Sequence, residues 1–119
     1  MPDSSCSYII NLYSLGLIVR DYNNEHNDVK VDGVSHGVVT LNVTVGSPAD
    51  IGNVPMGVVL TTINGKKIED TSMFSKTLKF PNKIFNIDYI GKEEVGTVKL
   101  KNEKYGAFMN GCTSQLKYK

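Results

Sequence analysis

The 119-residue chain has few of the residues from which most enzymes build an active site. It contains two histidines, His26 and His36, and two cysteines, Cys6 and Cys112, all far apart in the sequence. No P-loop, His-Glu-x-x-His or Cys-x-x-Cys motif is present, and the aspartates do not have the spacing of a calcium-binding loop. We therefore expect a protein that is not an enzyme, with no catalytic residues, no metal site and no cofactor.

Long apolar segments are also missing. No run approaches the roughly 20 apolar residues that cross a bilayer, and the N-terminus, MPDSSCS, has neither the basic nor the long apolar region of a secretory signal. We expect no membrane span and a cytoplasmic protein or, if the chain is viral, one in the host-cell cytoplasm or the virion. A disulfide between Cys6 and Cys112 would require the two ends to be neighbours, so two thiols in a reducing compartment are the better interpretation.

Charge of one sign is not in excess. Thirteen Lys and Arg residues stand against twelve Asp and Glu residues, so the formal net charge of +1 argues against a nucleic-acid partner. Residues 92–119 are mildly basic, with six lysines and three glutamates. A solvated strand face explains this local excess better than a surface that contacts phosphate.

The pattern that is present is mostly β, over a length that suits one domain. The expected strands are residues 7–13, 16–22, 38–45, 58–63, 66–68, 83–90 and 96–101, with a brief one within 29–37. A short helix should begin at Pro48 and end near Gly52, and a longer one should cover residues 69–80 before Pro81 stops it. Residues 102–119 have weak periodicity.

The order of these elements, and one stretch in particular, resemble a PDZ domain. In residues 36–68, HGVVTLNVTVGSPADIGNVPMGVVLTTINGKKI, a strand leads into Gly-Ser-Pro-Ala-Asp, a short helix, another strand and an Asn-Gly turn. The positions that match the family pattern are Gly46, Pro48, Ala49, Asp50, Gly57, Leu60, Ile63, Asn64, Gly65 and Ile68. Val58 departs from it, because an acidic residue is usual there, and Met73 stands where many such domains have histidine.

The resemblance implies an α+β, mainly β fold. This would be a PDZ-like, partly open β-sandwich or barrel of five to six strands, capped by one short and one longer helix. The resemblance covers about residues 8–101. We therefore expect a PDZ-like domain over residues 1–101 and a C-terminal extension, residues 102–119, packed on or beside it.

The resemblance also implies a function, which is to bind the C-terminal peptide of a partner, or a protein strand, by β-augmentation. The peptide carboxylate would meet an anion-binding loop formed by Ser14, Leu15, Gly16 and Leu17. The peptide groove would be lined by Ile18, Val19, Met73, Thr77 and Phe80. Because Met73 is apolar, we expect an apolar residue two positions before the peptide's end, and micromolar affinity.

Other interpretations stay open at this point. Leu15, Leu17 and Val19 could be core residues, and Phe74 and Leu78 fit the core better than the groove. The alternative function is a structural or assembly subunit, viral or phage among the possibilities, in which the groove is unused or blocked. Residues 103–119 distinguish the two functions, because a tail that covers the second strand would disfavour peptide capture. The sequence leaves the choice between monomer and homo-oligomer undecided.

Overall fold

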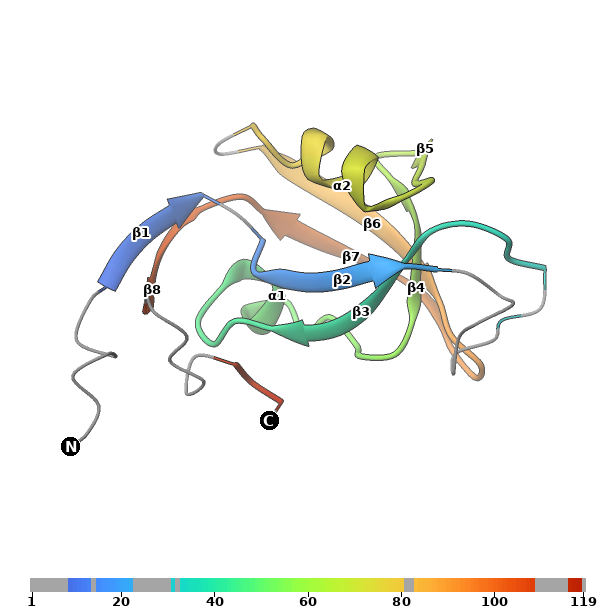
Figure 1. Ribbon diagram of the computed structural model, residues 1–119, viewed down its shortest axis with the longest axis horizontal. Helices are drawn as coiled ribbons and strands as arrows, with labels where there is room; N and C mark the ends of the chain where they lie inside the picture. The colour runs from blue at the N-terminus through green and yellow to red at the C-terminus, as the bar shows by residue number, and fades with distance from the viewer. Residues whose placement is uncertain are drawn as a thin grey trace.

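The computed structural model describes residues 9–13, 15–22, 31, 33–80, 83–108 and 116–118, with the backbone alone described in 9–13 and 104–108. These residues form eight strands and two helices (Figure 1). The strands are β1 (Ile9–Tyr13), β2 (Leu17–Asp21), β3 (Val38–Val43), β4 (Val59–Ile63), β5 (Lys66–Lys67), β6 (Ile84–Ile90), β7 (Val95–Lys101) and β8 (Lys104–Phe108). The helices are α1 (Pro48–Ile51) and α2 (Thr71–Thr77).

Six of the strands form one antiparallel sheet. Its order is β2–β3–β4–β6–β7, and β5 pairs with β4. Strands β1 and β8 pair with each other in a separate two-stranded sheet, which lies at the end of the molecule opposite the β6–β7 turn (Figure 1). The expected fold, mainly β with one short and one longer helix, is confirmed.

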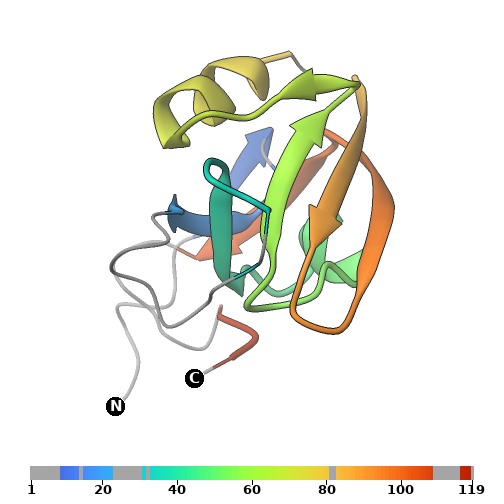
Figure 2. The same ribbon diagram turned by 90° about the vertical axis from the view of Figure 1, so that its right-hand side faces the viewer.

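The sheet curls around a single main core, and α2 covers the gap between β5 and β2 (Figure 2). The alternation along β6 places Phe85 and Ile87 in this core and Ile84 and Asn86 outside it. The other enclosed side chains come from strands β3, β4 and β7, from both helices and from the segments before β2 and after β5: Leu15, Val38, Val43, Ala49, Leu60, Ile63, Ile68, Phe74 and Leu100. Burial of each large apolar side chain contributes roughly 1.5–3 kcal/mol, so this cluster holds the layers together.

Local capping explains where α1 and α2 begin, and a contact from a distant residue explains where α2 ends. Ser47 caps α1 by accepting the Asp50 N–H, and the Asp70 carboxylate caps α2 by accepting the Met73 N–H at 2.8 Å. Helix α2 ends three residues before the expected position. The buried amide of Asn102 donates to the carbonyl oxygens of Leu78 and Phe80, 3.0 Å from each. The last carbonyl groups of a helix have no partner within the helix. Here the Asn102 side chain supplies the hydrogen bonds to the carbonyl groups that follow α2.

Two other segments differ from the expected elements. Residues 33–37 form no strand, although one was expected within 29–37, where residues 29, 30 and 32 lie outside the description. Strand β8 was not expected, because the sequence KYGAF shows no strong alternation. Its pairing partner β1 lies near the other end of the chain, so a local pattern could not reveal it.

The described end of the chain lies against β3, on the side away from β2. Leu116 forms a bridge with Thr44, and the Lys117 N–H donates to the Val43 carbonyl at 2.9 Å. The Thr44 N–H meanwhile donates to the carbonyl of Gly16, directly before β2, and successive residues of a strand direct their backbone groups to alternate sides. Residues 116–118 therefore occupy the edge of β3 that β2 does not use.

Helices α1 and α2, the only ones among the described residues, are both too short and too polar to span a membrane.

Candidate functional site

The segment that leads into β2 directs two backbone amides away from the body of the domain. The Leu15 carbonyl accepts the Ala49 N–H of α1, and the Gly16 carbonyl accepts the Thr44 N–H, both at 2.9 Å. In a trans peptide unit the N–H points opposite to the C=O. The Gly16 N–H therefore points away from α1, and the Leu17 N–H points away from β3.

Gly16 makes this arrangement possible. Its φ of 76° lies in the left-handed region, which glycine adopts without a steric penalty. Leu15 is 1% exposed and belongs to the core, so the loop is anchored on one side by a buried side chain and on the other by two carbonyl bonds. The Gly16 and Leu17 amides are therefore two successive backbone donors that point away from α1 and from β3. Ser14, the first residue of the expected loop, lies outside the described residues.

Strand β2 has a free edge next to these amides. It pairs with β3 on one side, and no other strand among the described residues pairs with it. Gly16 and Tyr22 both bond toward β3, as acceptor and donor respectively. By alternation, the backbone groups of Leu17, Val19 and Asp21 point away from β3. An extended segment can therefore add to this edge as a further strand.

Helix α2 lies alongside β2 (Figure 1) and is tied to it at one end, where the Thr71 N–H donates to the Asp21 carboxylate at 2.8 Å. The buried side chain of Phe74, 2% exposed, fixes the rotation of the helix about its axis. Successive residues turn by about 100° around an α-helix. With Phe74 inward, Thr71 and Ser75 lie on one flank of α2, and Met73 and Thr77 lie on the other.

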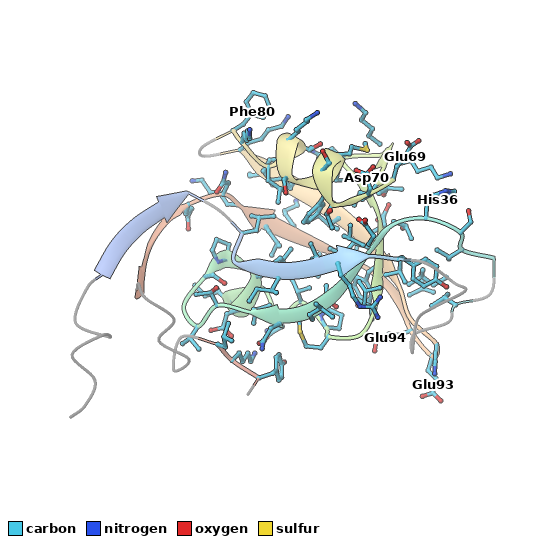
Figure 3. The ribbon with its side chains drawn as sticks, in the orientation of Figure 1. His36, Glu69, Asp70, Phe80, Glu93 and Glu94 are labelled. Atoms are coloured by element: carbon cyan, nitrogen blue, oxygen red, sulfur yellow. The ribbon has the colours of Figure 1, made fainter. Side chains whose placement is uncertain are left out.

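The flank that carries Met73 and Thr77 faces away from β2. These two side chains and Phe80 line a concave surface together with residues of the β4–β5 turn and with Lys83 at the start of β6. Figure 3 shows Phe80 pointing outward, on the side of α2 away from β2. The structure thus brings three of the expected groove residues together, but across the helix from β2.

The opposite flank, which faces β2, begins with Thr71 and Ser75 and continues to Leu78, which packs against the core cluster. The resemblance to a PDZ domain implies that Met73 lies on the groove face of the helix. The apolar residue that enters the core, Phe74, is the sequence signal that sets the rotation of the helix instead. Of the expected groove residues on β2, Val19 is half-buried against the core, and Ile18 is 37% exposed.

Comparison with known proteins addresses the fold. No family model and no curated protein matches the chain. A solved structure that does match is the crystal structure of the HtrA3 PDZ domain bound to a phage-derived ligand, FGRWV. The match has a TM-score of 0.67 and 17% sequence identity, and it covers 84% of this chain and 93% of that one. This chain has the PDZ fold. The resemblance carried by residues 36–68 is thereby confirmed at the level of the fold.

In this PDZ fold, α1 connects the amide loop to the end of the chain. The Asp50 carboxylate accepts the Gly46 N–H at 2.8 Å and pairs with the Lys117 ammonium at 3.0 Å. The Gly46 amide first, and Lys117 second, hold the pKa of Asp50 below the usual value for aspartate. The residue before Asp50, Ala49, donates its N–H to the Leu15 carbonyl. The ion pair of Lys117 with Asp50 therefore stabilises the helix that contacts the Gly16 loop.

We expect Lys117→Ala to raise the pKa of Asp50 while leaving it below the value for an aspartate in an unfolded chain. The Gly46 N–H, the larger cause of the lowered pKa, remains in the variant. A carboxyl whose pKa is depressed on folding stabilises the fold above its unfolded pKa and loses that contribution as pH falls through its folded pKa. NMR titration of the Asp50 side-chain carboxyl carbon measures both values. Identical titration curves in the two proteins would contradict the assignment.

The described histidine and acidic side chains form no cluster at this site. His36 is exposed, and its Nδ1 lies 2.9 Å from the Ser35 hydroxyl oxygen. Cys6, Cys112 and His26 lie outside the described residues. Among the side chains that the structure describes, no three of the His, Cys, Asp or Glu type come close enough to hold a metal ion.

Proposed function

We propose that this chain is a peptide-binding module that captures the C-terminal segment of a partner protein. The peptide adds to the free edge of β2 as an antiparallel strand, and its carboxylate accepts hydrogen bonds from the Gly16 and Leu17 amides. The observation that carries the proposal is the pair of outward amides placed directly before an unpaired strand edge. The structural neighbour was itself solved with a bound peptide ligand, which supports a peptide as the partner.

The residues around this edge suggest what the peptide looks like. Leu17, Val19 and Leu78 offer apolar surface near the carboxylate loop, so the last residue of the peptide is apolar. Thr71 and Ser75 line the helix side farther along β2, and their hydroxyls tolerate a polar residue there. The expected apolar residue two positions before the peptide's end depends on Met73, which lines the concave surface beside the β4–β5 turn.

A screen of random peptides with free C-termini, beside the same peptides with amidated C-termini, tests this function on the full chain. We expect enrichment of free-carboxylate peptides with an apolar last residue and micromolar affinity, about −8 kcal/mol. Ordering a short flexible peptide consumes much of its contact energy, which limits the affinity to this range. Equal recovery from both libraries would contradict capture of the terminus.

The alternative, a structural subunit with a blocked groove, has less support from the described tail. Residues 116–118 lie on β3 and β8 lies on β1, so neither covers the outer edge of β2. This placement of the described tail supports peptide binding over the structural alternative.

A further inference from the structure

The flank of α2 that faces away from β2 borders a second concave surface, with a volume of about 650 Å³. Its apolar part is formed by Met73 and Phe80, and its polar part includes the Asn64 amide and the Ser72 and Thr77 hydroxyls. We call this surface the α2–β5 pocket. It is separated from the β2 edge by the body of the helix, so a ligand here does not compete for the same backbone groups.

The α2–β5 pocket is positively charged. Lys66, Lys76 and Lys83 line it, and the acidic residue among the lining residues, Asp70, already uses its carboxylate to cap α2. Residues 63–83 contain five lysines and two acidic residues, a net charge of +3 in a chain whose total is +1. The remainder of the chain therefore carries −2. Among the residues that line the pocket, three lysines stand against one aspartate, a net charge of +2.

An exposed aromatic ring stands beside these lysines. Phe80 is 57% exposed, which is high for a side chain of this size, and the Lys83 ammonium lies 5.3 Å from its ring centroid. The same ammonium lies 5.7 Å from the ring of the buried Phe85, so Lys83 is held at the boundary between the core and the pocket. An apolar ring next to fixed ammonium groups suits a ligand that combines an apolar side chain with carboxylates.

We propose that the α2–β5 pocket binds an acidic segment of a partner protein, with one aromatic or aliphatic side chain on Phe80 and Met73 and carboxylates on Lys66, Lys76 and Lys83. The charge of the pocket selects the acidic chemistry. Its concave shape favours a peptide over a membrane, because a side chain enters a hollow that a flat bilayer surface cannot follow. The proposal stands independently of peptide capture at β2.

Fluorescence polarisation with the full chain tests this site. The probe is a fluorescein-labelled peptide of ten residues, nine glutamates around one central phenylalanine, with an amidated C-terminus so that it offers no terminal carboxylate to the Gly16 loop. We expect Lys76→Glu combined with Lys83→Glu to weaken binding by at least about tenfold. The matched control, Lys92→Glu combined with Lys99→Glu, changes the net charge equally at exposed positions outside the pocket and should change binding less than about twofold.

Three results would overturn the proposal. These are an equal loss of binding in both double variants, equal binding of a probe with glutamine in place of glutamate, and sedimentation of the chain with phosphatidylserine-containing vesicles that depends on Lys76 and Lys83. The Gly16→Pro variant separates this site from the β2 edge. It should bind the amidated acidic probe as the unsubstituted protein does, even when it no longer binds free C-termini.

Discussion

Gly16→Pro should weaken the binding of a free C-terminal peptide at least about a hundredfold, equivalent to about 2.7 kcal/mol. Proline removes the Gly16 N–H, one of the two amides assigned to the carboxylate, and a hydrogen bond to a charged group contributes about 1.5–3 kcal/mol. Its ring also fixes φ near −65°, whereas Gly16 has φ 76°, so the Leu17 amide is displaced as well. Isothermal titration calorimetry with a peptide from the screen measures the loss.

Gly65→Pro is the matched control for that variant. Gly65 has φ 81° in the β4–β5 turn, so proline imposes a similar backbone conflict there, at a distance from the Gly16 loop. Both variants should lose stability, by more than about 1 kcal/mol, and both should be compared while circular dichroism shows native structure. Gly65→Pro should still bind the peptide. Unchanged binding by a folded Gly16→Pro protein would refute the loop assignment.

Phe85→Ala should reduce the free energy of unfolding by about 3–5 kcal/mol. Phe85, the second residue of β6, is fully buried in the main core, and its truncation removes apolar contacts and leaves a cavity. A loss of this size is a large part of the 5–15 kcal/mol that stabilises a typical domain. Urea denaturation followed by circular dichroism measures the change.

Ile84→Ala provides the comparison for Phe85→Ala. Ile84 precedes Phe85 on the same strand, but its side chain is 50% exposed and points to the opposite face. Ile84→Ala should lower the free energy of unfolding by less than about 1 kcal/mol, because truncation of a surface side chain removes little buried area. Similar losses for the two variants would mean that the register of β6 relative to the core is wrong.

Residues 36–68 allowed much of the fold to be predicted from the sequence, because each turn there has a local physical cause. Ser47 and Pro48 define the start of α1, and Asn64-Gly65 adopts the positive φ values of a tight turn, 52° and 81°. The alternation in β6 likewise places its core residues correctly. Where capping, turn chemistry and periodicity agree, the sequence is sufficient.

Long-range contacts determine what the sequence could not predict. The end of α2 depends on Asn102, which lies 24 residues from Leu78, and β8 exists because it pairs with β1. The rotation of α2 about its axis decides which of its side chains face β2. The burial of Phe74 reveals this rotation, whereas a match to the family pattern by position in the sequence does not. In each case a tertiary contact, invisible to a local pattern, decides the outcome.

The proposed function requires that the Gly16 and Leu17 amides donate hydrogen bonds to a peptide carboxylate. Titration of the ¹⁵N-labelled chain with one peptide in free-acid and amidated forms tests it most directly by NMR. We predict that the free acid moves the Gly16 and Leu17 amide proton resonances downfield, as charge-assisted hydrogen bonds do, and that the amidated peptide leaves them unchanged. Equal shifts with both peptides, or shifts confined to residues outside the Gly16 loop, would contradict the claim.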